Sequence, residues 1–285
     1  MKYSVFTLIV LLPLIFACNQ GKKKQDNNVF KSGIIEDEPK SQDDWELVWS
    51  DEFNYTGLPD TTKWSYDVGG HGWGNNEKQY YTEADPDNAK VIDGVLEITA
   101  RQEKKDDNLY TSARLVTKNK GDWKYGKVEV SAKLPPGRGL WPAIWMLPTD
   151  WEYGGWPDSG EIDIMEHVGY NPDSIFQTVH TKSFNHTLGT QVGEATYVED
   201  VYNQFHTYSI IWDVAEIDFY IDGEKHFTFL NSGKGFDEWP FDKRFHLILN
   251  LAVGGNWGGQ KGIDDSVFPA TFTVDYVRVY KSNTE

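Results

Sequence analysis

Three carboxylates fall within six positions of one otherwise apolar stretch, Gly-Glu-Ile-Asp-Ile-Met-Glu-His, which contains Glu161, Asp163 and Glu166. The alternating isoleucines predict a strand, with Glu161 and Asp163 on the same face. Strict alternation would turn Glu166 to the apolar face, so we expect one extra residue, a β-bulge at Ile164-Met165, to return it to the acidic face. Glycoside hydrolysis needs two such carboxyl groups, one to protonate the leaving oxygen and one to attack or to activate water.

A solvated acidic edge strand is the alternative interpretation of this stretch. The density of aromatic side chains around the acids argues against this alternative, because flat rings pack on the faces of pyranose sugars. These aromatic residues are Trp141, Trp145, Trp151, Tyr153 and Trp156. Trp141 and Trp145 are four positions apart in an extended segment, so both can face a cleft, although core packing of one of them is a serious alternative.

The acidic stretch resembles the signature of glycoside hydrolase family 16 in its laminarinase-like branch, in which Met165 is the extra residue. Further segments resemble that family in its usual order: Asp51-Glu52-Phe53-Asn54, residues 69–81 (GGHGWGNNEKQYY), Arg114, residues 141–145 and Gln177-Thr178-Val179-His180. The resemblance runs from about Trp45 to Tyr280. It implies an all-β fold, a β-jelly-roll sandwich (concanavalin A-like) with a concave substrate cleft.

Carried over by position, the resemblance implies that Glu161 is the nucleophile, Glu166 the acid/base, and Asp163 a group that tunes both. Mutual repulsion and burial should raise the pKa of one acid, and Glu166 is the candidate to stay protonated. The resemblance also implies a substrate-binding set, which comprises Asn75, Asn76, Arg114, Trp141, Trp145 and His180.

His167 follows Glu166 directly and should face the opposite way, into packing. The histidines have no clustered metal-ligand spacing, so a zinc site is not expected. No cofactor is expected for catalysis, but the resemblance implies one structural calcium ion, held at positions matching Glu52, Gly94 and Asp275. Hard oxygen ligands of that kind suit calcium.

The rest of the chain predicts one large β domain. It has 285 residues, of which 12 are tryptophan, and a net charge of −17, which disfavours nucleic acid and anionic membrane surfaces as partners. Apolar and polar residues alternate at 96–101, 128–134 and 217–222, and Asp222-Gly223 predicts a tight turn. Further strands are expected at 245–253 and 271–280, with no amphipathic helix. Many short strands punctuated by glycine and proline predict a sandwich or jelly roll.

The N-terminus predicts export. Lys2 and the apolar run Val5 to Phe16 are typical of a signal peptide, and Ala17-Cys18 resembles a bacterial lipoprotein cleavage site. An ordinary signal peptide is the alternative. We therefore expect a signal peptide at 1–17, a flexible tether at 18–44 that begins with lipidated Cys18, and a hydrolase domain at 45–282. This organisation predicts a monomeric lipoprotein anchored to a bacterial membrane, at the cell surface or in the periplasm.

The function predicted from these features is an endo-acting, retaining hydrolase of β-1,3-glucan. Two alternatives remain open. One is another specificity of the same family, on mixed-linkage β-glucan, agarose or carrageenan, and the other is a non-catalytic glycan-binding lipoprotein. The presence of both Glu161 and Glu166 disfavours the second alternative, because a binding protein needs neither.

Overall fold

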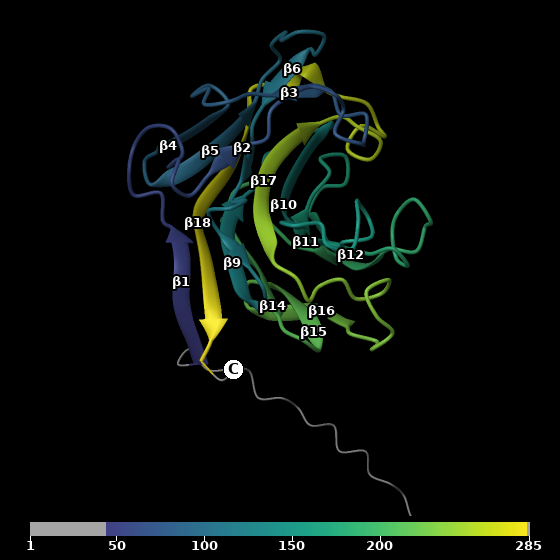
Figure 1. Cartoon of the computed structure of the whole chain (residues 1–285). Coiled ribbons are helices and arrows are strands. Elements are labelled where there is room, and N and C mark those ends of the chain that lie inside the picture. The colour runs from purple at the N-terminus through teal and green to yellow at the C-terminus, as the bar shows by residue number, and fades with distance from the viewer. Residues whose placement is uncertain (1–43, 284–285) are drawn as a thin grey trace, which may run out of the picture. The chain divides into compact units, whose positions relative to one another are not determined.

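Two antiparallel β-sheets and a short two-stranded sheet make up the fold in this computed structural model, which describes residues 44–283 (Figure 1). The first sheet has the order β16-β15-β14-β9-β18-β5-β4, with β1 paired to β18. The second has the order β13-β12-β11-β10-β17-β7-β2, with β8 paired to β17, and it carries the acidic stretch. The third sheet pairs β3 with β6 in parallel.

The strands of the first sheet are β1 (Trp45–Asp51), β4 (Ala89–Ile92), β5 (Val95–Ala100), β9 (Gly126–Lys133), β14 (His206–Trp212), β15 (Glu216–Ile221), β16 (Glu224–Leu230) and β18 (Ala270–Ser282). Those of the second are β2 (Ser65–Tyr66), β7 (Arg114–Val116), β8 (Asp122–Trp123), β10 (Leu140–Pro148), β11 (Glu161–Glu166), β12 (Ser174–His180), β13 (Val192–Tyr197) and β17 (Phe245–Val253). The third sheet has β3 (Gln79–Tyr81) and β6 (Tyr110–Ser112), and a 3-10 helix covers Asp265–Val267.

The alternating patterns of the sequence correspond to real strands with one buried face. In β5, Leu96 and Ile98 are fully buried, whereas Glu97 between them is partly exposed. The predicted turn after β15 also forms, because Asp222 and Gly223 both have positive φ, 52° and 80°. Two such residues in succession match the right-handed twist of the flanking strands. The all-β prediction is therefore confirmed for the described part of the chain.

One hydrophobic core lies between the two large sheets and draws side chains from both. Ile98 and Val130 come from the first sheet, and Ile162 and Leu249 come from the second. Every residue of β17 is buried, because one of its faces lies on this core and the other lies under the cleft. The outer face of the second sheet therefore forms the floor of the cleft.

The predicted β-bulge is present in β11. Asp163 and Glu166 are separated by two residues where their partners on β12, Thr178 and Phe176, are separated by one. A bulge leaves backbone groups without ladder partners. Here the buried side chain of Gln177 donates a hydrogen bond from Nε2 to the carbonyl oxygen of Ile164 at 3.1 Å. The bulge is thus stabilised by a side chain on the neighbouring strand.

The predictions about the N-terminus concern residues outside the described part of the chain. The signal peptide and Cys18 lie there, as does the tether apart from Asp44. Strand β1 begins at Trp45 and β18 ends at Ser282, within the compact unit formed by residues 41–285. Among the described residues, no helix is long and apolar enough to cross a membrane.

Candidate active site

Two adjoining cavities of about 420 and 550 Å³ lie over the second sheet, and both are lined by Glu161 and Glu166. The first extends from these acids over β10 and β17 to Arg114 on β7. The second extends from the same acids over β12 to Phe176 and Trp257. Together they form a cleft that runs across the strands, with the acids in its middle. A polymer could therefore be held on both sides of the acids.

Glu161 is held by an indole from the loop that precedes its strand. Trp156 donates a hydrogen bond from Nε1 to Oε2 of Glu161 at 2.8 Å. Burial raises the pKa of Glu161 to about 7, while hydrogen bonds from Asp163 and Trp156 and the charge of Arg114 oppose that rise. These three groups favour the ionised carboxylate, which is the form a nucleophile needs.

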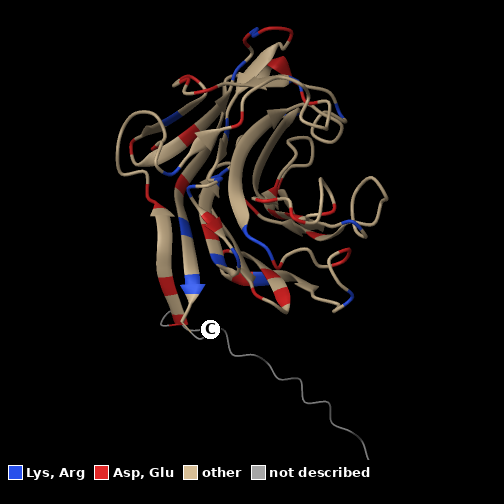
Figure 2. Ribbon diagram, viewed as in Figure 1, with Lys and Arg blue, Asp and Glu red and all other residues tan. Residues whose placement is uncertain are grey.

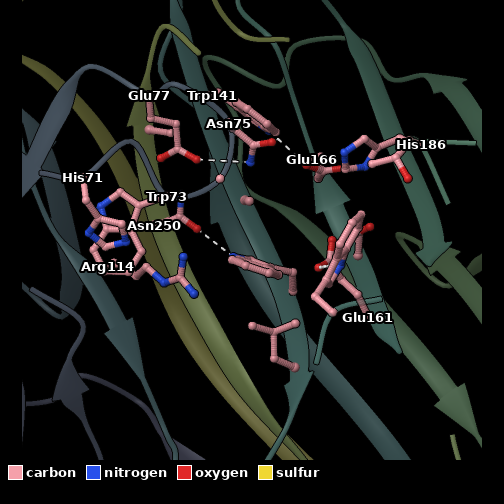
Figure 3. A pocket seen from close by; sticks show the side chains of 18 of the residues that line it. His71, Trp73, Asn75, Glu77, Arg114, Trp141, Glu161, Glu166, His186 and Asn250 are labelled. Carbon is pink, nitrogen blue, oxygen red and sulfur yellow. Dashed lines mark hydrogen bonds between the residues drawn. The ribbon is translucent and has the colours of Figure 1, made fainter. Parts of the chain in front are cut away.

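Glu166 has a similar indole partner from a different strand. Trp141 on β10 donates from Nε1 to Oε1 of Glu166 at 3.0 Å (Figure 3). Burial and the nearby negative charge of Glu161 raise the pKa of Glu166 to about 8. The charge of Glu161 thus favours the protonated form of Glu166, which is the form that a general acid needs.

Asp163 lies between the two glutamates on the same face of β11, and its side chain is only 3% exposed. Burial, followed by the charges of Glu161 and Glu166, raises the pKa of Asp163 well above its ordinary range. A protonated Asp163 can donate a hydrogen bond to Glu161, which favours ionisation of the latter. The central acid thus acts on its neighbour rather than carrying a second negative charge.

His180 reaches the acids because β12 pairs with β11 in a register that sets it opposite Glu161. Its Nε2 atom lies 3.4 Å from Oδ2 of Asp163 and 3.9 Å from Oε1 of Glu161. Burial, reinforced by nearby His186, lowers the pKa of His180 to about 4, so its ring is neutral at pH 7. His167 instead packs away from the cleft, where its ring nitrogens bond to Ser174 and Tyr202.

Arg114 provides the cation at the far end of the first cavity. Its guanidinium lies between two indole rings, 4.8 Å from the ring centre of Trp73 and 4.7 Å from that of Trp145. Its Nε atom forms an ion pair with Asp67 at 3.0 Å. Stacking of this kind holds a guanidinium plane in one orientation, so the remaining donors of Arg114 are directed for ligand hydroxyls.

A chain of hydrogen bonds fixes Trp145 and Glu77 beside Arg114. Trp145 donates to the side-chain oxygen of Asn250 at 2.7 Å, and Asn250 donates to the hydroxyl of Tyr81 at 3.0 Å. Tyr81 in turn donates to Glu77 at 3.4 Å. Glu77 lines the cleft, and Figure 3 places it across the cavity from Glu161. The sequence did not identify Glu77 or Asn250, because strands distant in the chain bring them together.

The two asparagines of the glycine-rich loop have different surroundings. Asn75 lines both cavities and donates to Glu77 at 3.3 Å. Asn76 lines neither cavity, and its side chain donates to Asn256 at 2.8 Å. Its φ of 56° turns the backbone between the two residues, so their side chains diverge. The structure thus places Asn75 in the cleft and gives Asn76 a position that supports the loop.

Aromatic residues near the acids are also divided between the cleft and other packing. Trp141, Trp145, Trp151 and Trp156 all line the first cavity. Tyr153 instead stacks on Phe236, with ring centres 4.6 Å apart, and donates to Asp242. Other cleft residues that the sequence did not identify are Trp73, Phe176, His186, Thr187 and Trp257. Only the density of aromatic residues in the sequence could have signalled some of them.

The positions proposed for calcium do not present a complete set of acidic side chains. Both carboxylate oxygens of Glu52 accept hydrogen bonds from Arg278, at 2.9 and 2.7 Å. Asp275 lies 3.5 Å from the hydroxyl of Ser131, and Gly94 lies in the turn between β4 and β5. The side chain of Glu52 therefore does not fit a calcium ligand, which leaves the Gly94 carbonyl and the Asp275 carboxylate.

Negative charge predominates in this protein, with 44 acidic against 27 basic residues, and acidic positions occur on strands and loops alike (Figure 2). Within the first cavity the imbalance is sharper. Its lining has four acidic side chains, Glu77, Glu161, Asp163 and Glu166, and one guanidinium, Arg114. A cleft with this lining suits a neutral ligand with many hydroxyl groups or a cation better than an anion.

Several known proteins are similar to this chain in sequence or in structure. A beta-glucanase from Rhodothermus marinus is 57% identical over 244 residues, which cover 83% of this chain and 85% of that protein. The X-ray structure of the laminarinase from Rhodothermus marinus has a TM-score of 0.82 at 56% identity and covers 84% of this chain and 98% of its own. A non-specific endo-beta-1,3(4)-glucanase has a TM-score of 0.82 at 47% identity, over 86% of this chain and 98% of its own.

The family model for glycosyl hydrolases family 16 matches residues 76–278, which include the acidic strand, Arg114 and His180. These residues form the larger part of the chain and all of the cleft described above except the loop before residue 76. The jelly-roll sandwich expected from the resemblance is confirmed by the structural match. This chain belongs to glycosyl hydrolase family 16.

Proposed function

We propose that this protein is an endo-acting, retaining β-1,3-glucanase of the laminarinase type. The observation that carries the proposal is the cleft, which extends on both sides of two buried glutamates whose pKa values are both raised. A cleft of this shape accepts the interior of a polymer, because chain can leave it in both directions. The similarity to a laminarinase at 56% identity supports β-1,3-glucan as the polymer.

In the proposed reaction, Glu166 donates its proton to the glycosidic oxygen while Glu161 attacks the anomeric carbon and forms a glycosyl-enzyme ester. The aglycone leaves with that proton. Glu166, now ionised, takes a proton from water, which attacks the same carbon and releases Glu161 with net retention. Asp163 stabilises the ionised Glu161 before attack through its hydrogen bond. Loss of negative charge on Glu161 in the ester lowers the pKa of Glu166, which suits its second role as a base.

Substrate binding is proposed on both sides of the acids. Arg114, Asn75 and Trp145 lie in the first cavity and would hold one side of the chain. Phe176 and Trp257 lie in the second, with ring centres 4.9 Å apart, and would hold the other. Flat rings and hydroxyl-directed donors of this kind require no charge on the ligand.

A second specificity, on mixed-linkage β-glucan, is supported by the similarity to a non-specific endo-beta-1,3(4)-glucanase. A reducing-sugar assay on laminarin, lichenan, agarose and carrageenan, with product sizing, separates the possibilities. We expect laminarin to be cleaved fastest, with oligosaccharides of mixed length as the first products. Release of single sugars from the outset would contradict endo action, and faster cleavage of agarose or carrageenan would contradict the glucan assignment.

The roles of the two glutamates can be tested separately. Glu161→Ser should abolish hydrolysis but leave oligosaccharide binding, because the aromatic and amide groups of the cleft remain. Glu166→Ala should still form the glycosyl-enzyme from a substrate whose leaving group needs no proton, and azide should then restore turnover with a β-configured product. Proton NMR of the first wild-type product should show the β-anomer. An α-anomer at that stage would contradict the nucleophilic role of Glu161.

We further propose that the protein is exported as a lipoprotein anchored through Cys18, acts as a monomer, and holds one structural calcium ion. Support for the anchor comes from the apolar run followed by Ala17-Cys18. Calcium is supported by family resemblance and by the register of β18, in which Val274 pairs with Leu96 and so brings Asp275 to the turn that contains Gly94. The ion would stabilise this turn and takes no part in the reaction.

A further inference from the structure

The catalytic strand and its neighbour create a group of side chains whose chemistry suits a metal ion. One ligand atom each from Glu161, Asp163 and His180 lies within 4.8 Å of the other two. Strand pairing alone produces the group, because Glu161 is opposite His180 and Asp163 is opposite Thr178. The spacing of histidines along the sequence gave no indication of it.

The distances within the group approach those of a tetrahedral zinc site. Ligand atoms about 2.0–2.2 Å from a tetrahedral Zn²⁺ lie about 3.3–3.6 Å from one another. Nε2 of His180 is 3.4 Å from Oδ2 of Asp163, which falls in that range, and 3.9 Å from Oε1 of Glu161. A shift of the Glu161 carboxylate toward His180 would bring this second distance into the range, and the ligand atoms of Glu161 and Asp163 lie within 4.8 Å of each other. The other oxygen of Glu161, Oε2, already accepts from Trp156.

Asp163 gives an independent indication of a ligand. Its Oδ2 atom is buried and has no hydrogen-bond partner among the described residues, although it lies beside Nε2 of His180. A buried carboxyl oxygen without a partner is costly, and a cation that replaces the proton of Asp163 would satisfy it.

We propose that Glu161, Asp163 and His180 form a binding site for a divalent transition-metal ion, with Zn²⁺ as its representative, and that the bound ion blocks the cleft. Two oxygen ligands and one imidazole are a donor set that zinc accepts, and the fourth position opens toward the substrate cavity. The ion would coordinate the carboxylate of Glu161, which is the group that attacks the anomeric carbon. Metal and glucan therefore exclude each other.

The site is expected to be weaker than a dedicated zinc centre. A histidine ligand ordinarily donates its second ring N–H to a partner that fixes the ring. Nδ1 of His180 has no such partner among the described residues, and the nearest aromatic neighbours, His186 and Trp156, contact it through their rings. Loss of that support costs about 10–100-fold in metal affinity. Reversible inhibition, rather than permanent occupancy, is the expected behaviour.

The test measures metal binding directly and does not depend on the glucanase assignment. ZnCl₂ is titrated calorimetrically into the full-length protein in a Cys18→Ser background, which removes the only thiol. We expect one site, whose affinity falls at least ten-fold in both His180→Gln and Glu161→Gln. His226→Gln, on strand β16 of the other sheet, is the matched control and should bind as the parent does. Thermal melting of each variant verifies that it is folded.

Two further measurements locate the ion. Co²⁺ in place of Zn²⁺ should give the strong visible absorption of a four-coordinate centre, and His180→Gln should abolish it. A β-1,3-linked glucan oligosaccharide should weaken Zn²⁺ binding in proportion to its own occupancy of the cleft. Equal Zn²⁺ affinity in the parent and in both site variants, or Zn²⁺ binding that a saturating oligosaccharide leaves unchanged, would overturn the proposal. Absence of glucanase activity together with the expected binding results would contradict only the proposed function.

Discussion

Replacement of Trp156 by phenylalanine should move the acidic limb of the pH–activity profile without dismantling the cleft. The substitution removes the N–H that donates to Oε2 of Glu161 at 2.8 Å but keeps a ring beside His186, whose centre lies 4.9 Å from that of Trp156. Loss of a donor disfavours the ionised form of an acid, so the pKa of Glu161 should rise from its value of about 7.

The size of the shift follows from the strength of one charged hydrogen bond. Such a bond contributes about 1.5–3 kcal/mol, and one pKa unit corresponds to about 1.36 kcal/mol, so the rise is about 1–2 units. The acidic limb of kcat/KM reports the ionisation of the essential base in the free enzyme. Below pH 6 the ionised fraction falls by the same factor, so kcat/KM should decrease about 10–100-fold relative to the wild type.

The basic limb provides an internal reference. It is governed by Glu166, whose pKa of about 8 is raised by burial and by Glu161, and whose own indole donor is Trp141. A rise in the pKa of Glu161 alone lowers the fraction of enzyme in which Glu161 is ionised and Glu166 is protonated, and it moves the pH of maximal activity upward. The two limbs belong to a coupled pair, so they are fitted together as macroscopic values.

The assay is kcat/KM on a soluble β-1,3-glucan between pH 4 and pH 10 for the wild type and two variants. Trp151→Phe is the matched control, because Trp151 lines the same cavity but donates no hydrogen bond to Glu161. Its acidic limb should stay in place. An unchanged acidic limb in Trp156→Phe, or an equal shift in Trp151→Phe, would refute the role of the indole hydrogen bond.

Four other outcomes are expected. Trp141→Phe should move the basic limb to higher pH, because loss of its hydrogen bond raises the pKa of Glu166; an unmoved basic limb would contradict this. Arg114→Met should raise KM for laminari-oligosaccharides about 10–100-fold, since one charge-assisted hydrogen bond contributes about 1.5–3 kcal/mol; an unchanged KM would show that Arg114 does not bind the substrate. Cys18→Ser should release active enzyme from the membrane fraction, and unlipidated native protein in mass spectra would contradict the anchor. EDTA should lower Tm by about 5–10 °C if calcium at 100 times its Kd contributes about 2.7 kcal/mol, and an unchanged Tm would count against the site near Asp275.

The sequence by itself determined the chemistry of the central strand. Alternation placed Glu161 and Asp163 on one face of the strand. Strict alternation would have turned Glu166 to the opposite face, and this mismatch predicted the bulge that the structure contains. The period-two patterns and the Asp222-Gly223 turn could also be predicted from the sequence, and so could the packing of His167 away from the cleft. All of these features depend on a few consecutive residues. Local backbone geometry decides which face each side chain occupies, so no distant contact had to be known.

Only the tertiary structure decided which distant side chains surround those acids. His180 faces Glu161 because of the register between β11 and β12. Arg114 lies beside Trp145 because β7 and β10 both pair with β17, and the loop between β2 and β3 places Trp73 on the other side of the guanidinium. The metal-binding geometry arises in the same way, although the histidine spacing argued against it.

The different positions of Asn75 and Asn76, and the carboxylate of Glu77 in the cleft, also followed only from the fold. The same is true of Glu52, whose carboxylate is taken by Arg278 from the other end of the chain. The physical reason is that register and loop geometry minimise the free energy of the whole core. Neighbours separated by a hundred residues leave no periodic signal in the sequence, whereas the face of a strand does.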